Sequence, residues 1–93
     1  LVEIEVDLLE QLDDILAAGP DIILLDNMDP DTLAEGVRRI GKRALTEASG
    51  GITLANVAEV ARTGVDRISV GALTHSVNQI NYSLDVLSHK EPQ

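Results

Sequence analysis

The sequence predicts an α/β fold of repeated βα units with parallel strands, forming a partial TIM-like α/β barrel. Four runs rich in branched aliphatic residues begin about two dozen residues apart, and stretches with helical spacing lie between them. Two of the returns from helix to strand share the pattern Gly-x-Asp followed by aliphatic residues, at residues 19–25 and 64–70. Such tight, repeated turns favour right-handed βα units, and therefore a parallel sheet that is either open or a sector of a barrel.

The four aliphatic runs predict strands near residues 2–6, 21–26, 44–48 and 66–70. Side chains alternate between the two faces of a strand, so Glu3 and Glu5 lie opposite the apolar residues of the first run. By the same alternation Asp26 shares a face with Ile22 and Leu24, and Glu47 shares one with Ser49. Each of the first three strands is therefore expected to carry an acid on the face away from the helices or at its end.

Helical spacing predicts helices near 8–18, 30–41 and 54–63. Gly19-Pro20 ends the first, and Asp29 caps the second with Pro30 at its first position. Thr53 is the expected cap of the third. After Gly71 the pattern indicates a short helix followed by a strand. We expect one partial α/β-barrel domain over residues 1–87 and a frayed tail over 88–93.

Composition excludes several classes of function. The formal net charge of −9 repels nucleic acid and anionic membranes, so neither is an expected partner. Without cysteine the chain has no disulfide, thiolate zinc site or cysteine nucleophile. It lacks an initiator Met, a secretory signal and a run of transmembrane length. We expect a cytoplasmic protein and a piece cut from a longer chain.

Polar residues and glycines cluster where the predicted strands end. The ends are residues 5–7, 26–27, 49–51 and 71–74, and in parallel βα folds these ends form the working face. The inner rim would gather four carboxylates with Arg67 as the nearby cation: Glu3, Glu5, Asp26 and Glu47. Carboxylates this close require counter-charges from a metal or from basic residues elsewhere, so the predicted site is incomplete.

Two glycine segments at the same edge predict a phosphate cradle. Ser49-Gly50-Gly51 places bare amides at the expected entry to a helix, where the dipole favours an anion. The next strand ends in Val70-Gly71-Ala72, and phosphate sites shared by two successive strands are frequent in βα barrels. Acids on one side and a phosphate cradle on the other suit a phosphorylated substrate that develops positive charge.

Each of these residues also has a plain structural interpretation. Asp26 alone is more often a turn or cap residue, Glu3 a solvated charge, and a glycine pair an ordinary turn. His75 alone would be a surface or helix-capping histidine, and His89 a solvated one. The coincidence of four strand ends favours the joint site over these separate interpretations.

Four quoted motifs carry a resemblance to a known family: "VEIEV", "IILLDNM-P", "EASGGIT--NV" and "ISVGALTHS". With their spacing, residues 1 to about 87 resemble the carboxyl-terminal part of quinolinate phosphoribosyltransferase, also called nicotinate-nucleotide pyrophosphorylase (carboxylating). The resemblance implies transfer of phosphoribosyl from phosphoribosyl pyrophosphate to quinolinate, with loss of carbon dioxide. The products are nicotinate mononucleotide and pyrophosphate, on the route to NAD.

The resemblance also implies roles for particular residues. Glu5 and Asp26 match the catalytic acids that contact the ribose and the magnesium-bound pyrophosphate, so Mg²⁺ arrives with phosphoribosyl pyrophosphate and no direct protein ligand is assigned. Six residues match the segments that hold the ribose phosphate: Ser49, Gly50, Gly51, Val70, Gly71 and Ala72. His75 matches a residue near that phosphate, and its role is open.

The family's amino-terminal sandwich domain and earlier barrel strands, which carry the basic residues for the quinolinate carboxylates, have no counterpart here. The expectation is half of an active site, inactive alone, from a full-length protein that forms a homo-oligomer, dimer or higher. Two alternatives stay open at this point. One is a different phosphate-binding α/β-barrel enzyme, and the other is a non-catalytic structural fragment.

Overall fold

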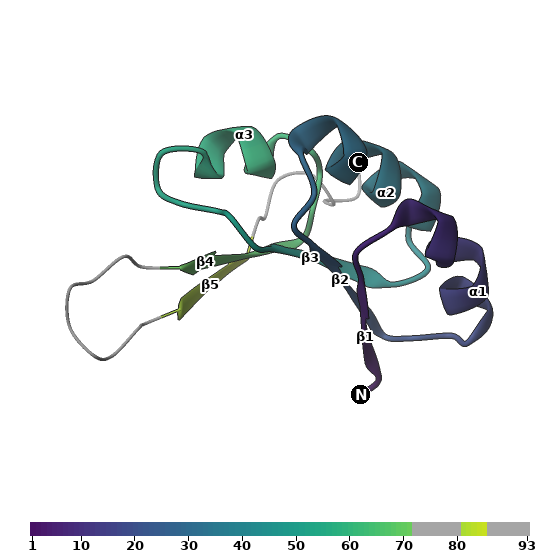
Figure 1. Ribbon diagram of the computed structural model, residues 1–93. Helices are drawn as coiled ribbons and strands as arrows, with labels where there is room; N and C mark the ends of the chain where they lie inside the picture. The colour runs from purple at the N-terminus through teal and green to yellow at the C-terminus, as the bar shows by residue number, and fades with distance from the viewer. Residues whose placement is uncertain (72–80, 86–93) are drawn as a thin grey trace, which may run out of the picture.

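The fold was analysed in a computed structural model that describes residues 1–71 and 81–85 (Figure 1). Helices and strands alternate along most of this length. Their bounds, in chain order, are β1 Glu3–Val6, the 3-10 helix η1 Leu9–Gln11, α1 Leu12–Ala17, β2 Ile22–Asp26, α2 Pro30–Ile40, β3 Leu45–Ser49, α3 Val57–Ala61, β4 Arg67–Gly71 and β5 Asn81–Asp85.

The described strands form one sheet in the order β1-β2-β3-β4-β5. β1 to β4 are parallel neighbours in chain order, which confirms the predicted α/β fold of repeated βα units. Figure 1 shows α1, α2 and α3 on the same face of the sheet. Helices on a single face are expected for a barrel sector, because a doubly wound sheet has helices on both faces.

β5 departs from the parallel pattern. It pairs antiparallel with β4, with Gly71 opposite Asn81 and Arg67 opposite Asp85. A parallel crossover needs a dozen or more residues, and only residues 72–80 lie between these two strands. The strand predicted after Gly71 is therefore present, while the short helix expected before it and the tail over 88–93 lie outside the described residues.

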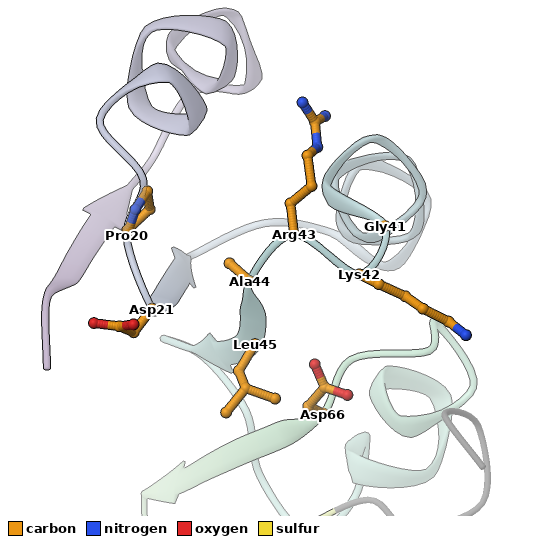
Figure 2. A pocket seen from close by; sticks show the side chains of 8 residues that line it. All are labelled: Pro20, Asp21, Gly41, Lys42, Arg43, Ala44, Leu45 and Asp66. Atoms are coloured by element: carbon orange, nitrogen blue, oxygen red, sulfur yellow. The ribbon is translucent and has the colours of Figure 1, made fainter. Parts of the chain in front are cut away.

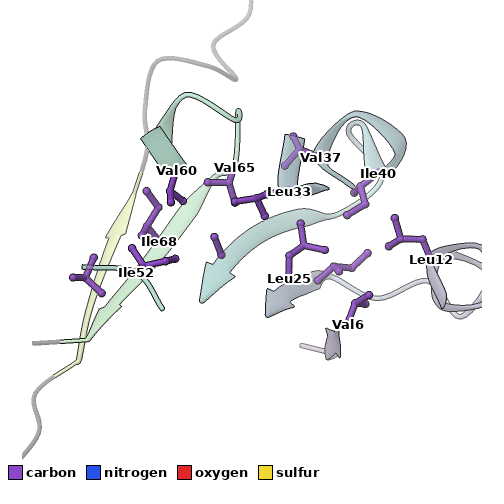
Figure 3. Packing of buried hydrophobic residues seen from close by; sticks show 13 residues of the cluster. Val6, Leu12, Leu25, Leu33, Val37, Ile40, Ile52, Val60, Val65 and Ile68 are labelled. Atoms are coloured by element: carbon purple, nitrogen blue, oxygen red, sulfur yellow. The ribbon is translucent and has the colours of Figure 1, made fainter. Parts of the chain in front are cut away.

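The hydrophobic core lies between the sheet and its helices. Figure 3 shows aliphatic side chains from β2, β4 and α2 meeting in this layer. Alternate strand residues supply one side of it, as the period of two requires. The buried members are Val6, Leu12, Ile23, Leu25, Leu33, Val37, Ile40, Ala48, Ile52, Val60, Val65, Ile68 and Val70. The opposite face of β1, β2 and β3 carries the acids Glu3, Glu5, Asp26 and Glu47, together with Ile22 and Leu24.

The helix starts match the sequence at α2 and differ at α3. The Asp29 carboxylate accepts a hydrogen bond from the Thr32 amide at 2.7 Å, which lowers the pKa of Asp29, and Pro30 is the first helical residue. The prediction of Thr53 as the cap of the third helix is wrong, because α3 begins only at Val57 with Asn56 as its cap residue.

The repeated Gly-x-Asp pattern joins neighbouring strands at their amino ends. Asp21 Oδ2 accepts a hydrogen bond from the Val2 amide at 2.7 Å. Asp66 Oδ2 accepts from both the Thr46 amide at 2.8 Å and the Thr46 hydroxyl at 3.1 Å. Each aspartate therefore holds the start of the preceding strand in the sheet.

None of the helices in residues 1–71 and 81–85 has the length and apolar character needed to cross a bilayer.

Candidate active site at the carboxyl ends of the strands

The strand register brings the predicted acids to one face of the sheet. Glu5 lies beside Leu24, Leu24 lies beside Glu47, and Asp26 lies beside Ser49. Val6, Leu25 and Ala48 are buried under the helices, so their sequence neighbours on each strand face the other way. Glu47 is next to Arg67, which is the one basic residue in the five described strands. The predicted acidic rim of Glu3, Glu5, Asp26 and Glu47 is therefore on one face.

Glu5 and Asp26 form a pair of interacting carboxyl groups. The pKa of Glu5 is raised, mainly by a hydrogen bond with the Asp26 side chain and by repulsion from its charge. Desolvation and the charge of Asp7 add to the effect. A cation or a developing positive charge placed there would offset the repulsion between the two groups.

Ser49 fixes one oxygen of the Asp26 carboxyl group. Its hydroxyl donates to Asp26 Oδ1 at 3.0 Å. The backbone repeats the connection, because the Asn27 amide donates to the Ser49 carbonyl at 2.8 Å. The ends of β2 and β3 are therefore joined twice, once through a side chain and once through the main chain.

The loop that follows β3 contains two adjacent glycines, Gly50 and Gly51, so its backbone amides are not covered by side chains of their own. Gly50 and Gly51 have φ of +81° and +68°, a region where residues with a Cβ are strained. Within the described part of the chain, no acceptor bonds to either amide. Residues 52–56 separate the loop from α3, so the expected location at a helix entry is wrong and the helix dipole adds nothing.

Asn56 holds this loop in shape, a role that sequence reasoning missed. Its side-chain oxygen accepts from the Thr53 amide at 2.8 Å, and its side-chain nitrogen donates to the Gly51 carbonyl at 3.0 Å. The Asn56 amide group uses its acceptor and its donor at once, and the Thr53 hydroxyl accepts from the Ala55 amide at 3.2 Å. Both residue types occur as helix caps, so the sequence pattern alone did not favour Asn56 over Thr53.

Hollows lie at both ends of the parallel strands in the described part of the chain. The one beside the glycine loop measures about 270 Å³ and is lined by Asn27, Met28, Asp29, Pro30, Gly50, Gly51, Ile52, Asn56, Glu59 and Val60. The larger, about 520 Å³, lies at the amino ends, where Figure 2 shows Asp21, Lys42, Arg43 and Asp66 around it. We assign the chemistry to the carboxyl edge, since parallel βα folds carry their sites there.

The second predicted phosphate segment is only partly described. The Val70 side chain is buried in the core, so only its backbone faces the strand edge. Gly71 is the last residue of β4 and pairs with Asn81. Ala72 and His75 lie outside the described residues.

The acid pair fits magnesium only as a companion of phosphate. Among the described residues no group of three or more His, Cys, Asp and Glu side chains could hold a metal ion. Mg²⁺ is commonly held by one or two carboxylates together with substrate phosphates and waters. Glu5 and Asp26 supply that number of carboxylates.

Comparison with known proteins places this geometry in a family. Residues 1–85 match the family described as "Quinolinate phosphoribosyl transferase, C-terminal domain". The chain belongs to this family. It is 43% identical over 90 residues to the "Probable nicotinate-nucleotide pyrophosphorylase [carboxylating]" of Bacillus subtilis. It is 51% identical over 87 residues to the "Nicotinate-nucleotide pyrophosphorylase [carboxylating]" of Mycobacterium leprae. The resemblance inferred from the motifs is therefore confirmed.

A solved structure agrees with the family assignment. The nicotinate-nucleotide pyrophosphorylase from Francisella tularensis superposes with a TM-score of 0.72 at 32% sequence identity. The match covers 88% of this chain and 31% of that one. The matches to the two curated relatives cover 97% and 90% of this chain, and 31% of the length of each relative. The chain thus spans about a third of the length of the proteins that it matches.

Proposed function

We propose that this chain is the carboxyl-terminal part of an enzyme that transfers phosphoribosyl from phosphoribosyl pyrophosphate to quinolinate. The transfer is coupled to decarboxylation and gives nicotinate mononucleotide for NAD biosynthesis. The observation that carries the proposal is the Glu5–Asp26 carboxyl pair beside the bare amides of Gly50 and Gly51, at one edge of a sheet from this family. Acids and a phosphate loop side by side suit a phosphorylated sugar.

The proposed role of the acids is electrostatic. Ribosyl transfer breaks the bond from the anomeric carbon to pyrophosphate and forms a bond to the quinolinate ring nitrogen. Positive charge develops at the anomeric carbon between these events, and fixed carboxylates nearby stabilise it. Glu5 and Asp26 take this role, with Asp26 oriented by the Ser49 hydroxyl. The amides of Gly50, Gly51 and Gly71 hold the ribose phosphate, and Ser49, Val70, Ala72 and His75 complete that site.

Magnesium would enter with phosphoribosyl pyrophosphate. When bound, the ion neutralises the leaving pyrophosphate, and Glu5 and Asp26 are the residues that would hold it. A cation at this position would also relieve the repulsion that raises the pKa of Glu5.

Quinolinate has two carboxylates, and Arg67 is the one basic residue in the described strands. We propose that the basic groups that bind these carboxylates come from other parts of a full-length protein, which acts in the cytoplasm as a homo-oligomer, dimer or higher. The coverage of 31% of the relatives' length supports this division of the site.

The test is turnover by a full-length protein that contains these residues. With magnesium, phosphoribosyl pyrophosphate and quinolinate, we expect nicotinate mononucleotide by chromatography, and no product when nicotinate replaces quinolinate. The 93-residue chain alone should give none. Glu5→Ala should slow the full-length protein roughly a hundredfold. Product from another phosphoribosyl acceptor but not from quinolinate would contradict the proposal.

A matched control separates the acid pair from charge in general. Asp14 is an exposed carboxylate on α1, away from the strand ends, so Asp14→Ala should leave turnover close to that of the parent. Equal losses in Glu5→Ala and Asp14→Ala would show that net charge, and not the pair, sets the rate.

A further inference from the structure

Gly50 lies directly against the end of the neighbouring strand β2. A Cβ placed on Gly50 would be 2.7 Å from Asp26 Oδ1, 2.9 Å from the Asn27 nitrogen and 3.2 Å from the Asn27 Cα. The two Asn27 atoms belong to the backbone, and its amide is already bonded to the Ser49 carbonyl at 2.8 Å. A side chain at Gly50 must therefore displace the Asp26 carboxyl group or separate the two strand ends.

Gly51 makes no such contact. Its φ of +68° is positive, as is the +81° of Gly50, but its Cβ would meet only Asn27 Oδ1, at 3.8 Å. That distance is ordinary van der Waals contact. Of these two adjacent glycines, only Gly50 leaves no space for a methyl group.

Asp26 Oδ1 is thus contacted from two sides by consecutive residues of β3 and its loop. The Ser49 hydroxyl donates to it at 3.0 Å, and the position that a Gly50 Cβ would occupy is 2.7 Å from it. Ser49 and Gly50 were expected only to hold phosphate. The contacts give them a second task, which is to set the direction of a carboxyl group that comes from a different strand.

We propose that Ser49 and Gly50 are positioning residues for Asp26, so that the phosphate loop and the acid act as one rigid unit. The inference rests on the proposed function and deepens it. Phosphate held by the loop is thereby kept at a fixed distance from the carboxylate that faces the anomeric carbon. A displacement of about 1 Å at such a group costs on the order of a hundredfold in rate.

The decisive experiment compares Gly50→Ala with Gly51→Ala in the full-length protein. Both place alanine at positive φ, where a side chain is strained, and they differ in the contact with Asp26. Crystal structures should show Asp26 Oδ1 beyond hydrogen-bond distance of Ser49 Oγ in Gly50→Ala, and unmoved in Gly51→Ala. An unmoved Asp26 in Gly50→Ala would overturn the inference. This measurement does not depend on turnover, so it stands even if the proposed reaction fails.

Kinetics give a second readout. Gly50→Ala should lower kcat on the order of a hundredfold. Gly51→Ala should act mainly through a higher KM for phosphoribosyl pyrophosphate. Equal kcat losses in both variants would mean that the loop serves phosphate alone, and would contradict the positioning role.

Ser49→Ala keeps the inference testable if Gly50→Ala does not fold, because it removes the hydroxyl and adds no volume. We expect a kcat loss of about fivefold to tenfold in the parent. In an Asp26→Ala background the same change should lower kcat no further, since the group that Ser49 orients is absent. Additive losses would show that Ser49 acts independently of Asp26 and would overturn the proposal.

Discussion

The two edges of the sheet, formed by the amino ends and by the carboxyl ends of the parallel strands, use aspartate in opposite ways. At the amino ends, the carboxylates of Asp21 and Asp66 accept hydrogen bonds from the backbone of the preceding strand. At the carboxyl ends, Asp26 accepts from a hydroxyl and faces the carboxyl group of Glu5. Asp21 and Asp66 each join two strands. Asp26 and Glu5 repel each other and attract a cation. The same residue type therefore stabilises the fold at one edge and provides chemistry at the other.

The largest expected effect comes from removing the aspartate at the carboxyl edge. Asp26→Ala in the full-length protein should lower kcat about a hundredfold or more, because a fixed negative charge near the anomeric carbon is lost. Its unfolding midpoint in urea should stay close to that of the parent, since Asp26 is only partly buried and its side chain accepts from the Ser49 hydroxyl. A large loss of both stability and activity would contradict the proposed difference between the two edges.

The matching change at the amino edge should have the reverse outcome. Asp66→Ala leaves the Thr46 amide and hydroxyl without their acceptor, and Thr46 is 0% exposed. We expect the free energy of unfolding to fall by about 2 to 4 kcal/mol, as buried donors lose their partner. Urea unfolding measures it, and kcat of the folded fraction should be unchanged. A lower kcat in that fraction would extend the active site to the amino edge.

Asp21→Ala tests whether burial sets the size of this effect. Asp21 accepts from the Val2 amide at 2.7 Å, but Val2 is 53% exposed and water can replace the carboxylate. The expected loss is below about 1 kcal/mol, within the range of a solvent-exposed hydrogen bond. The same urea titration measures this loss of unfolding free energy. A loss equal to that of Asp66→Ala would show that strand joining itself, and not the burial of Thr46, is what matters.

The smallest effect is expected from Glu35, an acid that belongs to neither edge. Hydrogen bonds from Arg38 and Arg39 on α2 lower the pKa of Glu35 from 4.5 to about 2. Because the folded pKa lies below the unfolded value, the contribution to stability is complete above pH 4.5 and is lost as the pH falls towards 2. Exposed ion pairs are weak. As the pH falls through this range, the melting temperature of the parent should therefore drop only slightly more steeply than that of the Glu35→Gln variant. Parallel curves for the two proteins would show that the pair contributes nothing.

Local pattern alone was enough to predict most of the fold. Alternation in β1 to β3 identified which residues face the helices, and Asp29-Pro30 located the start of α2 correctly. Both signals act within a few residues, where side-chain direction and capping are decided. The antiparallel β5 was not predicted as such, although the short link over residues 72–80 could have indicated it.

The candidate site was predicted as a set of residues but not as an arrangement. The sequence by itself determined that acids and glycines end the strands, and that Glu5 and Asp26 share the face away from the helices. Only the tertiary structure decided that Ser49 orients Asp26 and that Gly50 has no space for a side chain. The reason is that periodicity fixes the face of a residue, whereas its neighbours across strands depend on register. Register is set when β2 and β3 pair, more than twenty residues apart in the chain.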